Sequence, residues 1–452
     1  MNNPQVHNWF GDITSSPAVV VEPENVQDII SILQDTEKYP GPVRAVGSNH
    51  STTQCGVADN GTVVMMGKMN RILNIGTDTV TVEAGALYID VAKELRKHNL
   101  QFYVNVEIGS MTIGSAACCG TKNASMAGEF GQVCSYACAM KIVTPLGEIV
   151  EVTEEQPDLL QAARSSYGLF GIIYEVTFRV KPLASMAVYH KMYTLDTFDK
   201  RLPSLKTKGE SIMLYLSPFT NTITVEFRRY RTNENPQKAS SWQWKLRNFV
   251  WGVLAPYFSY IVTKYVRIRS IRDFLINSFT LLISFFAVLA VRGNNTLSSD
   301  QIIHYPKIAN NSKYTFTFWA FPEEDYTNNL RAYFKFCHDY YRSKGYRSNM
   351  MNVGYRIFED ISSLFSYTFN GPVITIDPVS TGNVGWEEFL LSYNEFCSQR
   401  GGIPLFNQTK SITRSQVEKA FGDRLSTFEV YRKRFDPTQR LLNEFFRQLL
   451  KY

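Results

Sequence analysis

Two loops rich in glycine and serine constrain the fold of this chain more than any other feature. The first, residues 44–51, reads Arg-Ala-Val-Gly-Ser-Asn-His-Ser, and the second, residues 108–123, reads Ile-Gly-Ser-Met-Thr-Ile-Gly-Ser-Ala-Ala-Cys-Cys-Gly-Thr-Lys-Asn. Small side chains leave backbone N–H groups open, and several such groups together can bind a diphosphate. Neither loop has the spacing G-x-G-x-x-G or G-x-x-x-x-G-K-[ST], so Rossmann and P-loop folds are not supported.

These loops resemble those of the vanillyl-alcohol-oxidase superfamily of FAD-linked oxidoreductases. The aldonolactone and alditol oxidases and the decaprenylphosphoryl-ribose oxidases are the most similar branches. The resemblance covers residues 23–182 and returns near the C-terminus in Phe-Asp-Pro-Thr-Gln-Arg-Leu-Leu-Asn, residues 435–443. It implies an α+β fold, in which a two-part PCMH-type FAD-binding domain is joined by an α+β cap domain that carries the substrate site. The C-terminal segment is expected to return to the FAD domain.

At 452 residues the chain is long enough for more than one hydrophobic core. We expect an FAD-binding domain over 1–183, a cap domain over 184–404, and a C-terminal segment over 405–452 that completes the active site. In the first part, helix-like apolar spacing predicts helices at 26–34 and 89–98, and β-branched runs predict strands at 63–66, 79–83, 140–144 and 172–180. In the second part the sequence predicts strands at 211–217 and 220–229, and helices at 327–344 and 386–399.

Charge and cysteine usage exclude several classes of function. The net charge of +6 is mild and no nucleic-acid-binding motif accompanies it, so no nucleic-acid partner is expected. The seven cysteines include no C-x-x-C pair, which predicts reduced thiols and no metal site. The N-terminus has neither a basic nor an apolar signal region, which favours the cytoplasmic side of a membrane. The sequence leaves the oligomeric state open.

The segment 242–292 is unusually apolar for a soluble oxidase. Its second apolar run, 274–291, has 18 residues without a charge, which is at the short limit for a spanning helix, and Pro256 interrupts the first run. Tryptophans at the start of the segment and a basic patch between the runs suit an interfacial anchor; the patch comprises Lys264, Arg267, Arg269 and Arg272. We therefore expect a peripheral or monotopic membrane-surface insertion. Two buried helices or a dimer interface are the alternative.

The resemblance also implies which residues bind FAD. Backbone groups of the two loops would surround the diphosphate and the isoalloxazine, and residues after 171 would hold the adenine. The expected set is Arg44, Val46, Gly47, Ser48, Asn49, His50, Ser51, Gly109, Ser110, Met111, Thr112, Gly114, Ser115, Gly120, Asn123, Gly128, Ile172 and Ile173. Families with Gly-x-x-His-Ser at this place attach the histidine to the flavin 8-methyl group, so a covalent link through His50 is expected. A polar loop histidine near FAD is the alternative.

Oxidation of a hydroxyl group requires a residue that takes its proton or stabilises the alkoxide. The resemblance assigns this role to Lys410, with Tyr355 as the next candidate, and Lys122 is expected close to the flavin or the substrate. Asn407, Gln408 and Thr375 are the expected substrate contacts. The aldonolactone and alditol oxidases carry a His-Trp pair in the Lys410 region that is missing here, which is a departure from the sugar-lactone pattern.

These features predict an FAD-dependent oxidoreductase that transfers a hydride from a CH–OH group to flavin N5. The substrate would be a sugar-like, alditol, aldonolactone or lipid-linked small molecule, reached at a membrane surface. Two alternatives stay open. One is a membrane-associated FAD-dependent reductase or desaturase of a hydrophobic lipid, similar to the sterol reductases. The other is a non-catalytic flavin-fold binding protein.

Overall fold

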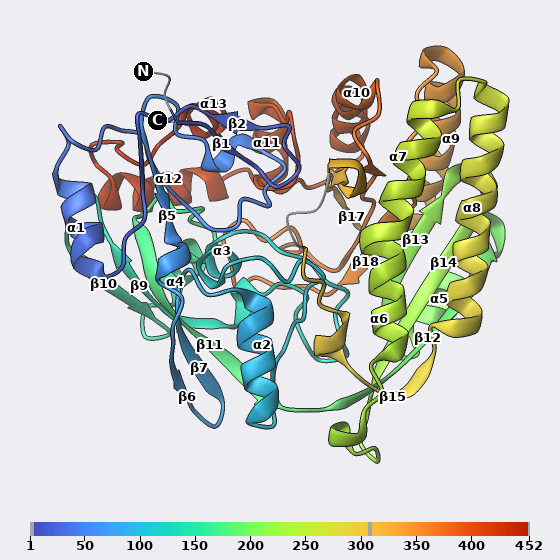
Figure 1. The fold of residues 1–452 in the computed structure, drawn as a ribbon, viewed down its shortest axis with the longest axis horizontal. Coiled ribbons are helices and arrows are strands. Elements are labelled where there is room, and N and C mark those ends of the chain that lie inside the picture. Colours follow the sequence, from blue (N-terminus) through green and yellow to red (C-terminus); the bar gives the residue numbers. More distant parts are fainter. Residues whose placement is uncertain (1–3, 306–309, 451–452) are drawn as a thin grey trace.

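The computed structural model describes residues 4–305 and 310–450. Figure 1 shows two α+β halves side by side, with the N- and C-terminal segments both in the half on the left. The element order and both halves agree with the α+β fold that the sequence predicts. The predicted helix 26–34 and strands 79–83 and 211–217 have the predicted bounds, and the predicted helix 89–98 is displaced by one residue, to Tyr88–Lys97.

The left half contains two larger sheets and a short hairpin of β1 (Val6–His7) and β2 (Thr14–Ser15). A parallel three-stranded sheet has the order β3 (Val19–Val21), β5 (Thr62–Met65), β4 (Val43–Val46). An antiparallel sheet has the order β10 (Ile149–Thr153), β9 (Ala137–Val143), β11 (Ile172–Pro182), β7 (Thr79–Glu83), β6 (Ile72–Ile75), and β8 (Leu100–Phe102) also pairs with β11. The helices of this half are α1 (Val26–Gln34), α2 (Tyr88–Lys97), α3 (Ile113–Cys118) and α4 (Pro157–Ala163).

The cap half is built on one long antiparallel sheet. Its strand order is β15 (Gly293–Leu297), β12 (Ser185–Thr194), β14 (Thr222–Arg231), β13 (Ser211–Ser217), β18 (Asn352–Ile357), β19 (Val373–Thr375), β17 (Ala320–Pro322). Strands β12 and β14 pair over their full length, from Ser185 opposite Arg231 to Thr194 opposite Thr222. Helices α5 (Leu195–Lys206), α9 (Tyr326–Lys344) and α10 (Trp386–Gln399) belong to this half.

The C-terminal helices return to the left half, as the sequence predicts. This half is the expected FAD-binding part of the chain and is called the FAD half. They are α11 (Arg414–Phe421), α12 (Arg424–Phe435) and α13 (Glu444–Leu449), drawn in red beside the blue N-terminal strands in Figure 1. The ring of Phe170 stacks on Phe428 and Phe435 of α12. The buried guanidinium of Arg44 donates hydrogen bonds to the carbonyl oxygens of Leu441 and Tyr167. These contacts hold the C-terminal segment against β4 and against the residues before β11.

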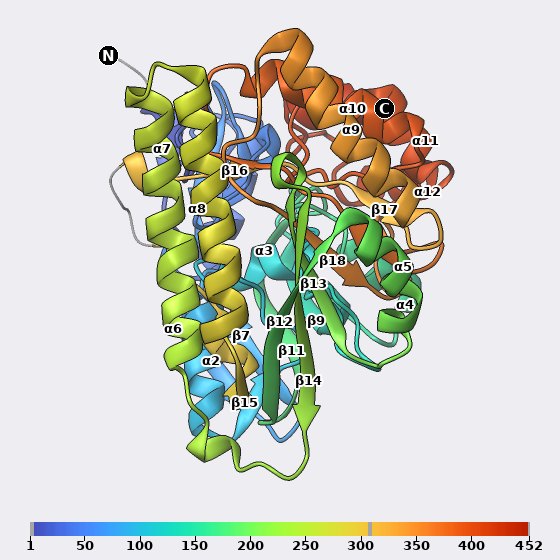
Figure 2. The same ribbon diagram turned by 90° about the vertical axis from the view of Figure 1, so that its right-hand side faces the viewer.

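The segment 242–292 forms a helical hairpin on one side of the cap, which Figure 2 shows edge-on as two adjacent columns. Helix α6 (Trp242–Phe249), a π-helical turn (Val250–Leu254) and α7 (Ala255–Tyr265) form the first column, and α8 (Arg269–Ala290) the second. The predicted interruption at Pro256 is wrong. Proline lies in the first turn of α7, where a missing N–H is tolerated, and the π-helical turn precedes it.

Helix α8 has one face against the cap and one apolar face in the open. It is the one helix among the described residues that is long and apolar enough to cross a membrane. Its inner face is held by Asp273, which accepts a hydrogen bond from Tyr341 of α9, and by Asn277, which accepts one from Arg347 at 2.7 Å. The outer face exposes large apolar side chains, with Phe274 68% and Leu282 65% exposed.

Candidate active site

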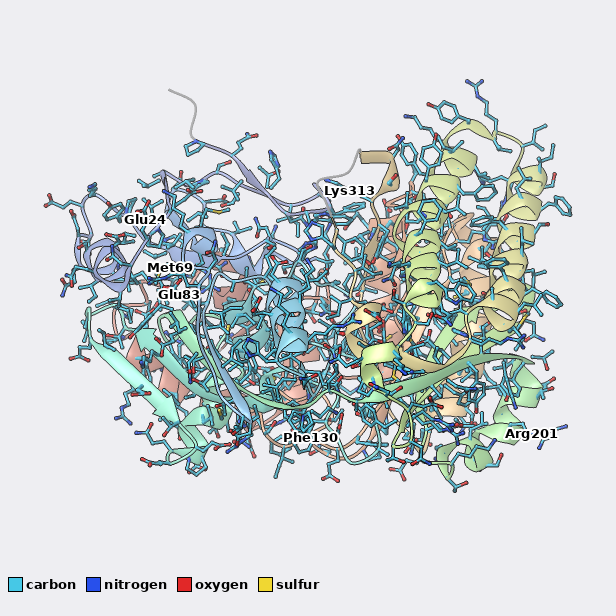
Figure 3. The ribbon with its side chains drawn as sticks, turned by 60° about the horizontal axis from the view of Figure 1, so that its bottom comes forward. Glu24, Met69, Glu83, Phe130, Arg201 and Lys313 are labelled. Atoms are coloured by element: carbon cyan, nitrogen blue, oxygen red, sulfur yellow. The ribbon has the colours of Figure 1, made fainter. Side chains whose placement is uncertain are left out.

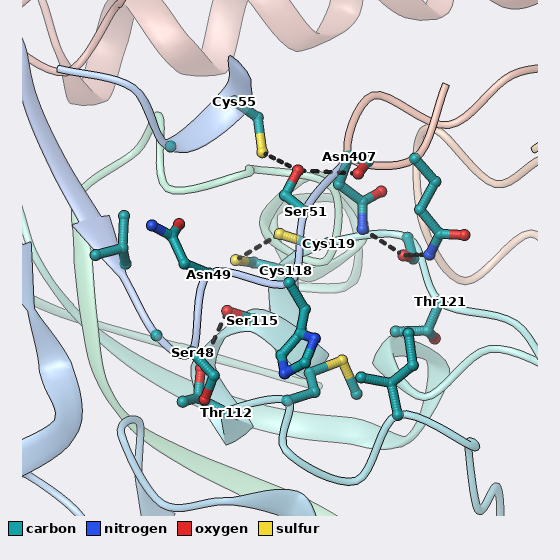
Figure 4. Close-up of a pocket in the computed structure, with 18 of the residues that line it drawn as sticks. Ser48, Asn49, Ser51, Cys55, Thr112, Ser115, Cys118, Cys119, Thr121 and Asn407 are labelled. Carbon is teal, nitrogen blue, oxygen red and sulfur yellow. Dashed lines mark hydrogen bonds between the residues drawn. The ribbon is translucent and has the colours of Figure 1, made fainter. Parts of the chain in front are cut away.

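A cavity lies between the FAD half and the cap, and both predicted loops line it. Residues 44–51 and the segment 106–122 form one wall, and Asn407 and Gln408 close one side. The cap contributes a mostly apolar wall of Trp251, Tyr314, Phe316, Val353, Tyr355 and Val379. Figure 4 shows the loop side chains converging on this space, with Asn407 reaching in from the C-terminal segment.

The two loops pack tightly against each other. A Cβ atom on Gly47 would lie 2.2 Å from the hydroxyl oxygen of Thr112, so only glycine fits at this contact. Thr112 and Ser115 bond through their hydroxyls at 3.1 Å (Figure 4). Asn49 adopts a left-handed conformation with φ of 57°. Within the described part of the chain, the backbone N–H groups of Ser48, Asn49 and His50 donate no hydrogen bond, so they are free to bind a diphosphate.

The C-terminal loop bonds to the first loop and carries unpaired acceptors. The Ser51 hydroxyl donates to the Asn407 carbonyl oxygen at 2.9 Å, and the Thr52 N–H donates to the same oxygen at 3.1 Å. The side-chain amide N–H groups of Asn407 and Gln408 donate to the Gly120 carbonyl oxygen at 2.9 and 3.4 Å. Their side-chain oxygens are buried in the cavity wall without a partner in the described residues. Together with the open N–H groups, these orphaned acceptors fit a polar cofactor such as FAD.

His50 lies in the cavity wall as a neutral imidazole. Its ring stacks on Trp9 with 5.3 Å between centroids. Burial, followed by the nearby His304 and Lys313, lowers the pKa of His50 to about 4. Lys313, labelled in Figure 3, also lies 5.5 Å from the Trp9 ring centroid. A neutral ring nitrogen in this wall is chemically suited to act as a nucleophile.

Lys122 is one of the cavity-lining residues, and its buried amine forms an ion pair with Asp377, which is outside the lining. The amine nitrogen lies 2.5 Å from the carboxylate, and the two side chains are 9% and 0% exposed. The rings of Phe316, Phe318 and Tyr355 surround the amine at 4.8, 4.7 and 5.7 Å from their centroids. Burial lowers the pKa of Lys122, whereas Asp377 opposes this shift. Burial also raises the pKa of Asp377, to about 6, against the effect of Lys122.

Tyr355 belongs to a second buried polar group in the cap wall. Its hydroxyl donates to the Glu107 carboxylate at 3.2 Å, and Glu107 also pairs with Arg247 of α6. The Arg247 guanidinium donates to the Tyr215 hydroxyl at 3.1 Å. Burial raises the pKa of Tyr355 above its ordinary value, so this residue can donate a hydrogen bond but is a poor base.

Lys410 and Thr375 lie elsewhere than the sequence analysis expected. The Lys410 amine bonds to Asp12 and Glu387, each at 2.8 Å, and the residue is absent from the described cavity lining. Burial lowers the pKa of Lys410, but the bonds to Asp12 and Glu387 outweigh burial and raise it. Thr375 is fully buried, and its hydroxyl accepts the Tyr355 backbone N–H at 3.1 Å. Neither side chain is in a position to contact a substrate in this cavity.

The expected FAD contacts divide into two groups. Thirteen residues line the cavity: Arg44, Val46, Gly47, Ser48, Asn49, His50, Ser51, Met111, Thr112, Gly114, Ser115, Gly120 and Ile173. Five do not: Gly109, Ser110, Asn123, Gly128 and Ile172. Asn123 accepts a hydrogen bond from Arg228, Ser110 accepts one from the Tyr305 N–H, and Gly128 lies in an exposed turn with φ of 77°.

Sequence reasoning missed Glu107, Arg247, Trp251 and Asp377. Glu107 directly precedes the second loop, and Asp377 follows the strand Val373–Thr375. Their positions next to a predicted loop and a strand end could have identified these two residues as site candidates. Arg247 and Trp251 lie in the segment that we interpreted as an anchor. The structure shows that the same segment also supplies part of the cavity wall.

Comparison with known proteins agrees with this geometry. Residues 17–153 match the FAD binding domain family. The chain is 28% identical over 243 residues to L-gulonolactone oxidase of Mus musculus, which covers 53% of this chain and 54% of that protein. It is 25% identical over 238 residues to L-gulono-1,4-lactone dehydrogenase of Mycobacterium tuberculosis strain H37Rv, covering 52% and 54%. The chain thus spans about half the length of the curated relatives it matches.

Solved structures extend the likeness to the whole fold. Cholesterol oxidase from B. sterolicum has a TM-score of 0.78 at 15% identity, covering 99% of this chain and 96% of that chain. A solvent-stable cholesterol oxidase has a TM-score of 0.71 at 13% identity, covering 98% and 97%. These findings confirm the resemblance to the FAD-linked oxidoreductases and the expected α+β architecture. The chain carries an FAD-binding domain, and FAD is its cofactor.

Proposed function

We propose that this protein is an FAD-dependent oxidoreductase that oxidises a CH–OH group of a small molecule. The observation that carries the proposal is Lys122, a cavity-lining residue whose buried amine is paired with Asp377. Bound FAD would supply the hydride acceptor at flavin N5. The residues of the chain must then bind the alcohol, exclude water and take up the hydroxyl proton. Lys122 is suited to the last task, and Lys410 is not, because it is held outside the cavity lining.

The cavity lining supports two substrate classes. Asn407 and Gln408 have unpaired amide oxygens that could accept hydrogen bonds from hydroxyl groups, as a sugar-like substrate requires. The cap wall, with Trp251, Tyr314 and Phe316, is aromatic and suits an apolar or lipid-linked body. The named relatives include both lactone oxidoreductases and cholesterol oxidases. We therefore propose a substrate with a hydroxyl-bearing head and an apolar portion.

A direct test is anaerobic addition of candidate alcohols to the purified, FAD-loaded protein. L-Gulono-1,4-lactone and cholesterol in detergent represent the two classes, and loss of the oxidised flavin absorbance reports hydride transfer. Reduction by either alcohol supports the proposal. A protein that stays oxidised with a broad panel of sugars, alditols and sterols, but is reoxidised by an unsaturated lipid after chemical reduction, would favour the reductase alternative.

We propose further that FAD is covalently attached through His50. The supporting observation is a neutral imidazole in the cavity wall, held by stacking against Trp9. Attachment of an imidazole to the flavin raises its reduction potential, which favours oxidation of unactivated alcohols.

We also propose that the hairpin of α6, α7 and α8 binds a membrane surface. One face of α8 is anchored to the cap through Asp273 and Asn277, and spanning a bilayer would require these bonds to break. The outer face, with Phe274 and Leu282, suits shallow insertion among lipid chains. The basic patch at the tip adds attraction to anionic headgroups. Because Trp251 of the same hairpin lines the cavity, this arrangement would bring the site close to lipid.

A further inference from the structure

We infer that Asp377 is the positioning residue for Lys122 and that the two side chains handle the hydroxyl proton as one unit. The inference rests on the proposed function for its chemistry. The pairing itself can be tested without any substrate.

Asp377 is fixed in place by its own backbone. Its N–H donates to the Val353 carbonyl oxygen at 2.8 Å, and its carbonyl oxygen accepts the Val353 N–H at 3.0 Å. Val353 belongs to β18, the strand that also carries Tyr355. The carboxylate is therefore attached to the rigid sheet of the cap, whereas Lys122 comes from the loop after α3 in the FAD half. The ion pair joins the two halves at the cavity wall.

The surroundings of the pair leave Asp377 as the carboxylate that stabilises the charged form of the Lys122 amine. Among the described residues, Asp377 is the one carboxylate in ion-pair contact with Lys122. The ring of Tyr355 faces the amine, and the titratable groups that interact electrostatically with Asp377 are Tyr326, Tyr355, Tyr367, Tyr393 and Cys397. Glu107 is bonded to Tyr355 and neutralised by Arg247. The remaining contacts of the amine are the aromatic faces of Phe316 and Phe318, which stabilise its charged form.

The proton balance of alcohol oxidation shows what the pair would do. An alcohol that is oxidised gives up its C–H hydrogen with both electrons, which bound FAD would accept, and its O–H hydrogen as a proton, which leaves a carbonyl product. A charged ammonium cannot accept that proton. Lys122 must first pass its own proton to the Asp377 carboxylate, and the neutral amine then takes the hydroxyl proton. The pair ends with one extra proton, which Asp377 releases to water before the next turnover.

This role gives the reaction a defined pH dependence. Burial raises the pKa of Asp377 to about 6, so the carboxylate is available above that pH and protonated below it. Flavin reduction should therefore slow as the pH falls through about 6. In Asp377→Asn the acid limb should move up to the pKa of the Lys122 amine, which must then lose its proton to water, and the rate at neutral pH should fall at least about tenfold, the scale of a lost positioned acid–base group.

The test of the pairing uses the amine itself and needs no turnover. The FAD-loaded protein is treated with a limiting amount of acetic anhydride at a series of pH values. Mass spectrometry of the peptide that contains Lys122 then gives its reactive, uncharged fraction. Because Asp377 raises the pKa of Lys122, Asp377→Asn should shift the labelling curve to lower pH by at least one unit, which is about tenfold more labelling at fixed pH. Glu387→Gln, beside Lys410, is the matched control and should leave Lys122 unchanged.

Two outcomes overturn the inference. One is an unchanged labelling curve in Asp377→Asn, and the other is no labelling of Lys122 in either protein, since the amine would then not face the cavity. Flavin retention and the thermal midpoint establish that each variant is folded. If Asp377→Asn does not fold, Asp377→Glu keeps the charge but displaces the carboxylate. It should leave the labelling curve within about half a unit of wild type and slow flavin reduction at least about tenfold. A shifted labelling curve in Asp377→Asn, with no alcohol reducing wild type, would refute the proposed function but keep the pairing.

Discussion

His50 is held as a neutral imidazole by burial against Trp9, and this is the state that a nucleophile requires. We predict that the intact denatured protein carries the added mass of one FAD. His50→Ala should lose this mass while still binding FAD reversibly, because the open N–H groups of the first loop remain. Intact-protein mass spectrometry measures both forms. An unmodified mass in a fully flavin-loaded wild-type preparation would contradict the covalent link.

Variants of Lys122 and Lys410 test which of the two lysines takes part in the reaction. Lys122→Met removes the amine of a cavity-lining residue, so reduction of the flavin by a competent alcohol should slow about a hundredfold. Lys410→Met removes an amine bonded to Asp12 and Glu387, and reduction should stay within about threefold of wild type. Stopped-flow absorbance at the flavin band compares them. The reverse order of effects would restore Lys410 as the catalytic lysine.

The contact between the two loops depends on a single glycine. In Gly47→Ala the new methyl group would overlap the Thr112 side chain, so the loops must separate and the diphosphate cradle must open. We expect FAD content after purification to fall at least tenfold. Gly67→Ala is the matched control, since a Cβ there meets nothing within 4 Å, and it should retain FAD. Equal flavin content in both variants would show that the loop contact does not form the binding site.

Substitutions on the outer face of α8 test the proposal that the hairpin binds a membrane. Leu282 and Phe285 are 65% and 61% exposed, and burying such a side chain in lipid contributes about 2 kcal/mol. Leu282→Glu/Phe285→Glu should therefore abolish binding to vesicles containing phosphatidylserine, measured by flotation at low salt. Val430→Glu changes an apolar side chain that is 69% exposed on α12, outside the hairpin, and should bind like wild type. Vesicle binding unchanged in the double variant would assign this face to another partner.

Local patterns were enough to predict several of the longer elements. Helix 26–34 has a regular apolar face and an Asn25 N-cap, so its bounds are encoded within the segment itself. The first loop was recognisable because glycine and serine mark a backbone-lined site. The Lys122–Asp377 pair was not, because its partners lie on different halves of the molecule and only the folded chain brings them together. Lys410 matched the family lysine by sequence. The orientation of its side chain, however, is set by ion pairs with Asp12 and Glu387, and no local sequence pattern reveals these pairs.

At the scale of the whole molecule, the cavity lies where three separate parts of the chain meet. The FAD half supplies the cradle, the cap supplies the aromatic wall and Asp377, and the C-terminal segment supplies Asn407 and Gln408. Because the C-terminal segment completes the cavity, its helices return to the FAD half. This arrangement also means that the cofactor and the substrate wall are assembled only in the complete fold.

The central claim is that this assembly binds FAD and passes electrons to it from an alcohol. The most direct measurement is the flavin absorption spectrum of the purified protein under anaerobic conditions, before and after addition of L-gulono-1,4-lactone or cholesterol in detergent. The account predicts a yellow protein whose flavin band bleaches with at least one of these alcohols, and bleaches far more slowly in Lys122→Met. A protein that neither contains nor takes up FAD would contradict it.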